Sequence, residues 1–481
     1  MKVRGERWVV LGAEKSGIAA AKLLARNGAS VLLSEKKPLD LIGVSDEKRG
    51  GMRLNEELND FGIATEFGGH SNQVLEFDKC VISPGIASSV AIVKELELRG
   101  CRIISEIELA ARFCKAKIVA ITGTDGKTTT TTLTAKILSN AGNEKGFKAM
   151  ALGNIGEAFS NHAEKLTEKD VAVVETSSFQ LDHCYSYKPA VSVITNITPN
   201  HLDRYDNNFQ KYAASKYRIF QAQDENDVLI YSEDSETLSQ HIAALRAEGK
   251  LKVKAIPFSL KKDLSKDYAD CGFLKDGELT VCINGFQEPI IKEDVILNSV
   301  HFRGKHNAYN SLAAAIASRA LEVRKEVIRE SIKTFEGVEH RIEFVREVGG
   351  VRFVNDSKAT TVNAMWYALD TIPDGIVLIA GGRDKGNDYS KVFDLVRQKV
   401  KAIVAIGESK EKIINAFSGI TEVFSADSFD EAILISSRKA AEGDTVLLSP
   451  ACASFDMFAN FEERGSIFKR IVNALPEAVK A

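Results

Sequence analysis

A phosphate-binding loop is the first chemistry that the sequence indicates. An apolar run that predicts a strand (KIVAIT) and a run that predicts a helix (TTTLTAKIL) flank a short Gly/Thr segment, which is the context such a loop requires. Backbone N–H groups and the helix N-terminus cradle phosphates there, a lysine reaches the β- and γ-oxygens, and a hydroxyl ligates Mg²⁺. The segment is shorter than the usual pattern, so a Gly-rich turn with a surface lysine stays open. Its residues are Gly123, Thr124, Asp125, Gly126, Lys127, Thr128 and Thr129.

Three further side chains follow this loop and suit metal or phosphate chemistry. Glu175 ends the apolar run VAVV, and a carboxylate at a strand end beside a phosphate loop is well placed to hold Mg²⁺. His201 lies after a predicted strand in a loop, where its imidazole could ligate a metal or contact phosphate. Lys216 lies in a helical run. On spacing alone the alternatives are an ordinary strand-end charge, a loop histidine bonded to backbone and a solvated helix lysine.

The N-terminal glycines indicate a nucleotide site of a restricted kind. Gly12 and Gly17 match the outer positions of G-x-G-x-x-G, but Glu14 occupies the middle one, where glycine lets backbone approach a pyrophosphate. A nicotinamide or flavin dinucleotide is therefore disfavoured. Glu35 ends the next predicted strand, where an acidic side chain could bind a ribose or a base edge. A mononucleotide or nucleotide sugar fits better, and a purely structural turn stays open.

Polar loops also follow predicted strands near the C-terminus. They are NDSKATT (355–361), GGRDKG (381–386) and SPACASFD (449–456), and strand-end loops of an open α/β sheet face its ligand crevice. Lysines there suit a carboxylate substrate, whereas helix capping is the plain alternative. Cys452 has no obvious histidine partner, so we interpret it as a buried structural thiol.

Three α/β domains are predicted to carry these loops. The runs at 7–12, 16–27 and 30–34 read as strand, helix and strand, and a new start follows at KIVAITGTDGK. Short β-like runs around the turn at 275–277 predict an antiparallel hairpin. We therefore expect a Rossmann-like N-terminal domain, a central P-loop ATPase-like domain and a C-terminal Rossmann-like α/β domain, over residues 1–112, 113–337 and 338–481.

Composition narrows the class of protein. The 481 residues carry 63 Lys and Arg against 66 Asp and Glu, a net charge of −3, which provides no basic field for a nucleic acid backbone. Seven cysteines without a C-x-x-C pair indicate reduced thiols rather than a zinc site or disulfides. We do not expect the N-terminus to be a signal peptide, because its apolar run stops after a few residues, and no run approaches the length of a membrane span. We expect a cytoplasmic monomer that binds no nucleic acid and does not insert into a membrane.

The order of the motifs resembles that of the Mur ligases. The resemblance covers essentially the whole chain; the phosphate loop and EHRIE are shared across the family, folylpolyglutamate synthases included, whereas NDSKATT with SPACASFD points to the member that adds D-glutamate. The motifs in order are GTDGKTTT, GNIG, ETSSFQL, NITPNHLDR, Lys216, GKHN, EHRIE, NDSKATT, GGRDKG and SPACASFDMFANFEERG.

The resemblance implies an ATP-dependent ligase of peptidoglycan biosynthesis. ATP would phosphorylate the L-alanine carboxylate of UDP-N-acetylmuramoyl-L-alanine, and the amine of D-glutamate would attack the acyl phosphate. Lys127 would stabilise the transferring phosphoryl group, Thr128 and Glu175 would hold one Mg²⁺, and His201 and Lys216 a second. Lys216 would act as a carbamate, because an ammonium cannot ligate a metal.

The resemblance also assigns substrate contacts by position. For ATP they are Asn307, Arg341 and Asp356; for the uridine diphosphate substrate Lys15, Ser16, Glu35 and Asn154; for D-glutamate Lys358, Thr360, Lys385, Ser454 and Phe461. Two residues depart from the family pattern: Asp125 stands where asparagine is common, and Asn200 replaces an acid before the histidine. A ligase for another amino acid, a noncatalytic nucleotide-sugar-binding protein and, less favoured, a nicotinamide oxidoreductase stay open as alternatives.

Overall fold

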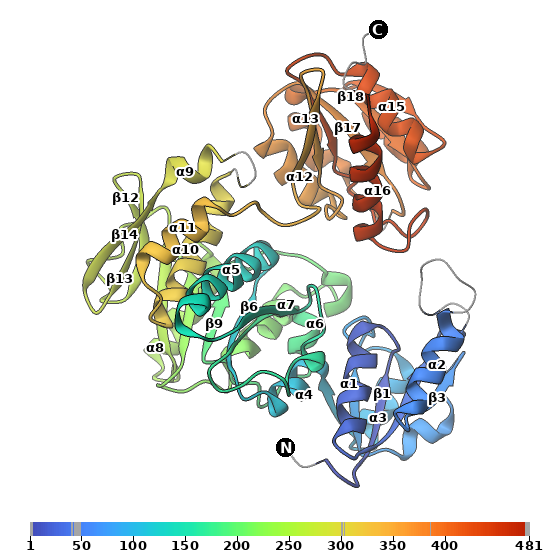
Figure 1. Ribbon diagram of the computed structural model, residues 1–481, viewed down its shortest axis with the longest axis vertical. Coiled ribbons are helices and arrows are strands. Elements are labelled where there is room, and N and C mark those ends of the chain that lie inside the picture. The colour runs from blue at the N-terminus through green and yellow to red at the C-terminus, as the bar shows by residue number, and fades with distance from the viewer. Residues whose placement is uncertain are drawn as a thin grey trace. The chain divides into compact units, whose positions relative to one another are not determined.

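The protein is an α/β protein with three sheets. The computed structural model describes residues 3–39, 42, 50–299, 302, 304–384 and 386–476. Figure 1 shows each sheet with helices packed around it. Within these residues no helix is long and apolar enough to cross a bilayer.

The first sheet is fully parallel, with strand order β3-β2-β1-β4-β5. The predicted strand, helix and strand at its start are confirmed as β1, α1 and β2, and apolar residues of all three are buried in one hydrophobic core. The strands are β1 (Arg7–Leu11), β2 (Ser30–Glu35), β3 (Ala64–Phe67), β4 (Lys79–Ile82) and β5 (Arg102–Ser105); the helices are α1 (Lys15–Arg26), α2 (Gly50–Asp60), α3 (Ala91–Leu98) and α4 (Glu106–Phe113).

The second sheet has nine strands in the order β14-β13-β12-β11-β10-β9-β6-β8-β7. The predicted hairpin is confirmed as β12 and β13, and β14 extends it by a strand that the sequence did not indicate. The strands are β6 (Lys117–Thr122), β7 (Ala149–Gly153), β8 (Val171–Glu175), β9 (Val191–Ile194), β10 (Val228–Ser232), β11 (Lys254–Ser259), β12 (Cys271–Lys275), β13 (Glu278–Ile283) and β14 (Phe286–Lys292).

Helices of this region include the longest in the described chain, α5, which follows the Gly/Thr loop. Strand β6 lies between β8 and β9, and its central residues are fully buried because helices cover both faces of the sheet. The helices are α5 (Lys127–Lys145), α6 (Ser178–Leu181), α7 (Phe209–Tyr217), α8 (Glu236–Ala247), α9 (Glu293–Leu297), α10 (Lys305–Ala320) and α11 (Lys325–Lys333).

The third sheet has the order β15-β16-β20-β17-β18-β19, with β15 antiparallel and the others parallel. The predicted strands of this region are confirmed, and β15 and β19 at the two edges were not anticipated. The strands are β15 (Glu343–Val348), β16 (Val351–Asn355), β17 (Ile376–Gly381), β18 (Val400–Ile406), β19 (Glu422–Ser425) and β20 (Thr445–Leu448); the helices are α12 (Val362–Thr371), α13 (Phe393–Lys399), α14 (Lys410–Phe417), α15 (Phe429–Lys439) and α16 (Phe461–Ala474).

The chain forms two compact units, Met1–Leu297 with Lys305–Phe335, and Asn298–Gly304 with Glu336–Ala481. The first unit holds the first two sheets. Buried carboxylates of α4 join them, since Glu106 accepts the N–H of Ser160 at 2.6 Å and Glu108 accepts that of Ser186 at 3.2 Å. Each predicted range, 1–112, 113–337 and 338–481, contains one sheet.

Candidate active site

The Gly/Thr loop joins the end of β6 to the start of α5, as the motif requires. Gly123 and Gly126 have φ of +151° and +80°, values that favour glycine. A Cβ at Gly123 would collide with the Thr195 hydroxyl, and one at Gly126 with the side-chain oxygen of Asn310. Glycine is therefore needed at both positions for reasons of space as well as conformation.

Residues after β9 hold the first half of this loop. The N–H groups of Thr124 and Asp125 donate to the backbone and side-chain oxygens of Asn196, at 2.9 and 3.0 Å. The hydroxyl of Thr195 donates to the carbonyl of Asp125 at 2.6 Å. Since these groups are engaged within the protein, an anion would meet the N-terminal N–H groups of α5, which have no partners within the helix.

Lys127 and Thr128 are the first two residues of α5, at the helix N-terminus where an anion would bind. The Lys127 ammonium donates to the carbonyl of Thr124 at 2.7 Å, so its side chain folds back over the loop. Thr128 is buried in the first turn of the helix. A cation and a hydroxyl thus lie at the positive end of the helix, where a phosphate would be stabilised.

Glu175 ends β8 next to the loop, in register with Ile121 of β6. Its side chain is 2% exposed. One carboxylate oxygen, Oε1, accepts a hydrogen bond from the Asn154 amide at 2.9 Å, whereas Oε2 is buried without a hydrogen-bond partner. A buried acceptor without a donor is costly unless a ligand such as a cation meets it, so this oxygen fits a metal.

Lys216 lies in α7 and is 2% exposed. Its Nζ donates to the carbonyl of Gly123 at 2.7 Å and lies 4.8 Å from the Tyr212 ring centre. Burial, with the charge of Lys127, holds the pKa of its ammonium well below the usual range. The solvated helix lysine that spacing alone favours is therefore wrong, because the fold turns this face of α7 against the loop.

His201 lies in the loop before the 3₁₀ helix Leu202–Tyr205, with a left-handed φ of +51°. Its ring meets that of Phe179 edge-on at 5.3 Å. Part of the imidazole stays exposed, yet desolvation by its neighbours and the charge of Lys127 lower its pKa. This favours the neutral form, which is the form that ligates metals.

The structure brings Asn307 close to the loop through α10. Asn307 is buried and accepts a hydrogen bond from the Asn310 amide at 3.1 Å, and the oxygen of Asn310 accepts one from Thr130 at 3.3 Å. No three His, Cys, Asp or Glu side chains of the described residues gather as a metal site. The predicted metal set contains only two such residues, Glu175 and His201, so this finding leaves it untested.

The N-terminal candidates lie where β1 and β2 end. Lys15 and Ser16 begin α1, and Glu14 before them forms an ion pair with Lys37 at 3.0 Å. Glu35 is buried, and its two oxygens accept the N–H groups of Ala13 and Lys37, each at 2.8 Å. Glu35 therefore holds the turn between β1 and α1 in place. The sequence did not indicate this role.

Asp356 and Arg341 lie together in the second unit. Asp356 follows β16 and is buried; its oxygens accept the hydroxyl of Ser449 at 2.8 Å and the N–H of Ile342 at 3.2 Å. Burial raises the pKa of its carboxyl to about 7, against the opposing charge of Arg341. The Arg341 Nε is buried without a hydrogen-bond partner. Their relation to the phosphate loop stays a prediction, because that loop lies in the other unit.

The D-glutamate candidates gather only in part. The Lys358 ammonium lies 5.4 Å from the centre of the Phe461 ring, and the hydroxyl of Ser357 donates to the Phe461 carbonyl at 2.8 Å. Thr360 follows Lys358 in the same loop, and Ser454 is buried in the loop after β20. Lys385 lies outside the described residues.

Sequence reasoning missed Arg464, which links these loops. This buried residue of α16 donates from Nε to the Ser357 hydroxyl at 2.9 Å and from its terminal nitrogens to the Cys452 carbonyl at 3.2 Å. The FEERG run that contains it gave no signal of this role. The prediction that Cys452 is a buried thiol is confirmed, and all seven cysteines are free.

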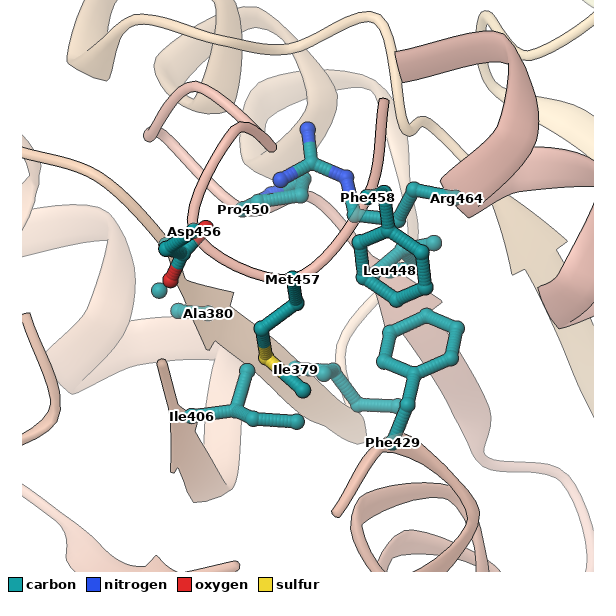
Figure 2. A pocket seen from close by; sticks show the side chains of 12 residues that line it. Ile379, Ala380, Ile406, Phe429, Leu448, Pro450, Asp456, Met457, Phe458 and Arg464 are labelled. Carbon is teal, nitrogen blue, oxygen red and sulfur yellow. The ribbon is translucent and has the colours of Figure 1, made fainter. Parts of the chain in front are cut away.

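A small pocket over the third sheet is a different feature. Figure 2 shows Ile379, Ile406, Phe429, Met457 and Phe458 gathered around it, with Asp456 and Arg464 at its margin. None of the four described D-glutamate candidates lines it. Its walls are apolar, so they offer little to a substrate with two carboxylates.

Two family profiles match the chain. One, described as "Mur ligase middle domain", matches residues 121–318. The other, described as "Mur ligase, glutamate ligase domain", matches residues 340–452. The first contains the phosphate loop, Glu175, His201 and Lys216, and the second contains Arg341 and Asp356.

Curated relatives match along nearly the whole chain. A protein from Chloroherpeton thalassium named UDP-N-acetylmuramoylalanine–D-glutamate ligase is 55% identical over 471 residues, 98% of each chain. Proteins of the same name from Chlorobium limicola and Salinibacter ruber are 46% and 44% identical, over 99% and 98% of this chain and 99% of their own.

Solved structures support the fold. The UDP-N-acetylmuramate–alanine ligase of Thermotoga maritima aligns with a TM-score of 0.57 and 18% identity, covering 97% of this chain and 99% of its own. A murein peptide ligase from Psychrobacter arcticus aligns with a TM-score of 0.53 and 16% identity, over 99% and 100%. At these identities the likeness concerns the fold alone.

Proposed function

Because this chain belongs to the Mur ligase family, we propose that it joins D-glutamate to UDP-N-acetylmuramoyl-L-alanine in an ATP-dependent step of peptidoglycan biosynthesis. Relatives whose names state this ligase activity match the chain from end to end. Within the structure, the observation that carries the chemistry is the partnerless buried oxygen of Glu175 beside a glycine loop and the start of α5.

The reaction divides into two transfers. The L-alanine carboxylate of the substrate attacks the γ-phosphorus of ATP, which releases ADP and forms an acyl phosphate. The amine of D-glutamate then adds to the acyl carbon and loses a proton, and the tetrahedral intermediate expels inorganic phosphate to leave an amide. Lys127 and the N-terminal N–H groups of α5 stabilise the charge on the transferring phosphoryl group.

Mur ligases use Mg²⁺, and the donor chemistry of this site fits that ion. Oε2 of Glu175 and the hydroxyl of Thr128 are hard oxygen donors, and His201 and Lys216 would serve a second ion. Bound Mg²⁺ would neutralise charge on the phosphate oxygens. What this chain supplies is the orientation: Asn154 holds Oε1 of Glu175, which turns the other oxygen to a fixed place.

Lys216 would reach the metal as a carbamate. Its neutral amine adds to CO₂ and loses a proton, which gives an anionic group with two oxygens. Burial supports this, because it lowers the pKa of the amine and so raises the fraction that is neutral, and the N–H that remains on the carbamate nitrogen can keep its bond to the Gly123 carbonyl.

Each range would bind mainly one substrate, with single contacts from a neighbouring range. Residues 1–112 would bind the uridine diphosphate part through Lys15, Ser16 and Glu35, with Asn154 contributing from 113–337. Residues 113–337 would bind ATP through the phosphate loop and Asn307, and residues 338–481 would add Arg341 and Asp356. The D-glutamate contacts would be Lys358, Thr360, Lys385, Ser454 and Phe461.

We further propose a monomer that acts in the cytoplasm, where seven free thiols persist.

The test is an assay of phosphate release with ATP, Mg²⁺, UDP-N-acetylmuramoyl-L-alanine and one amino acid at a time. We expect release that depends on D-glutamate. Release with another amino acid would instead make the chain a different ligase of the family. Substrate binding without ATP turnover by folded protein would favour a noncatalytic nucleotide-sugar-binding protein.

A further inference from the structure

Arg204 connects the segment that follows β4 of the first sheet with a helix that follows β8 of the second sheet. It lies three residues after His201 and is half-buried. One terminal nitrogen, Nη2, donates to the carbonyls of Ile86 at 3.1 Å and Pro84 at 3.4 Å. The other, Nη1, lies 3.4 Å from the carbonyl of Gly85. A single guanidinium thus contacts three consecutive carbonyls of the segment that follows β4.

The same guanidinium packs on the central sheet. Its carbon lies 4.1 Å from the centre of the Phe179 ring. Phe179 belongs to α6, which begins three residues after Glu175, and its ring also meets that of His201 edge-on. Arg204 therefore contacts a ring that itself packs against His201, one of the predicted metal ligands.

The 84–86 segment lies beside the turn of the first sheet that we propose binds the nucleotide sugar. The hydroxyl of Ser83 donates to the carbonyl of Gly12 at 3.4 Å, and Ile86 packs against the position where a Cβ of Gly12 would stand. Gly12 opens the turn into α1, where Lys15 and Ser16 lie. A continuous path of contacts thus runs from the start of α1 through Arg204 to Phe179 and His201.

We propose that Arg204 is a positioning residue that fixes the spacing between the nucleotide-sugar loops and the phosphoryl-transfer centre. This rests on the proposed function, in which one elongated substrate must reach both places at once. Displacement of a reacting group by about 1 Å costs on the order of 100-fold in rate. An arginine suits the task, because its planar fork offers several donors at fixed angles, whereas a lysine offers one compact charge.

The chain provides a matched control for the contact between these two sheets. Glu164 accepts hydrogen bonds from Asn27 at 2.8 Å and from Arg26 at 3.2 Å, both at the end of α1 remote from Lys15. Glu164→Gln weakens a polar contact between the same parts of the unit without touching any loop in the path. It therefore separates loss of spacing from a general loosening of the interface.

The experiment compares Arg204→Ala, Arg204→Lys and Glu164→Gln in the full chain. For each we would measure kcat, KM for both nucleotide substrates, the thermal midpoint, and binding of UDP-N-acetylmuramoyl-L-alanine without ATP. Arg204→Ala should lower kcat by about 100-fold while substrate binding and KM for ATP change little. Arg204→Lys should fall between it and the wild type, and Glu164→Gln should match the wild type.

The inference would be overturned by a wild-type kcat in Arg204→Ala, by an equal loss in Glu164→Gln, or by a loss that appears as weaker substrate binding with kcat unchanged. A loss of kcat that disappears when the assay is run well below the thermal midpoint would show a merely structural role and overturn it too. If the wild-type chain itself shows no turnover that depends on D-glutamate, the proposed function fails, and this inference fails with it.

Discussion

Two glutamates end parallel strands of the first unit and differ in what their oxygens contact. Glu35 ends β2 of the first sheet, and both its oxygens accept backbone N–H groups. Glu175 ends β8 of the second sheet, and one of its buried oxygens accepts nothing. The same residue type at the same kind of position therefore has both oxygens bonded to backbone in one sheet and one oxygen without a partner in the other.

This difference teaches that place in the topology is not enough to assign a ligand. Strand ends of an open sheet face its crevice, and both glutamates satisfy that rule. What separates them is the count of acceptor positions already filled by the protein. Within this pair, the unfilled acceptor position beside the phosphate loop is what distinguishes Glu175 from Glu35.

The largest effect should come from Glu175→Gln. The amide keeps the size of the side chain but replaces an anionic oxygen at the proposed metal position, so we expect kcat to fall by about 1000-fold. The thermal midpoint should stay close to that of the wild type. A steady-state assay with saturating Mg²⁺ checks this, and retained activity would remove Glu175 from the site and with it the contrast to Glu35.

Lys216→Ala should have the next largest effect. Loss of the proposed carbamate oxygens should lower kcat by about 100-fold. Added CO₂ cannot restore activity because the amine is gone, whereas a short carboxylic acid should do so in part by entering the vacated space. The readout is kcat with and without bicarbonate or acetate, with acetate added to wild type as the control. Full activity in the variant would contradict the carbamate.

Glu35→Gln should act mainly on stability and on the nucleotide substrate. A glutamine has one acceptor oxygen where two backbone N–H groups need partners, so unfolding free energy should fall by about 1–3 kcal/mol. KM for UDP-N-acetylmuramoyl-L-alanine should rise more than kcat falls. Denaturant unfolding and steady-state kinetics measure both. Glu14→Gln, in an exposed pair with Lys37, is the control and should change neither.

Asp356 is a third carboxylate at a strand end, in the third sheet. It is buried, and both its oxygens accept hydrogen bonds. Its folded pKa of about 7 lies above the ordinary 3.8, so the folded state binds the extra proton between these values. Stability should therefore fall as pH rises from 4 to 7, by at most about 1.4 kcal/mol per pH unit.

Asp356→Asn removes this titration. The unfolding free energy of the variant should therefore rise relative to that of the wild type between pH 4 and 7. Above pH 7 the two pH dependences should be parallel. Arg341 and Arg464, which face the carboxyl, are left in place in both proteins. Denaturant titrations at several pH values give the comparison. Parallel curves throughout would mean that Asp356 is ionised in the folded protein.

Local pattern was enough for the parts of the site that lie on one segment. The strand, glycine loop and helix around Lys127 follow from residue types, and Glu175 follows from the end of an apolar run. Burial of Lys216 does not, because α7 has a weakly amphipathic sequence and only packing against the loop decides which face is inside. The partners of Glu35 and Arg204 lie on distant segments, so their roles could not be predicted either.

Some strands at the edges of the sheets could likewise not be predicted from the sequence. Strands β14, β15 and β19 are short or partly exposed, and their burial does not alternate clearly. Interior strands such as β17, buried along their whole length, were predicted because they read as continuous apolar runs.

The β13–β14 hairpin at the border of the nine-stranded sheet has a consequence for how the protein behaves at high concentration. Its outer strand, β14, carries Pro289, which lacks an N–H, and a register shift interrupts its pairing with β13. Glu288 beside it is held in an ion pair with Arg319 at 2.7 Å. A border with a missing donor, a bulge and a fixed charge is a poor template for a strand from another molecule. The hairpin thus ends the lateral growth of the sheet and protects the folded chain from aggregating along that border.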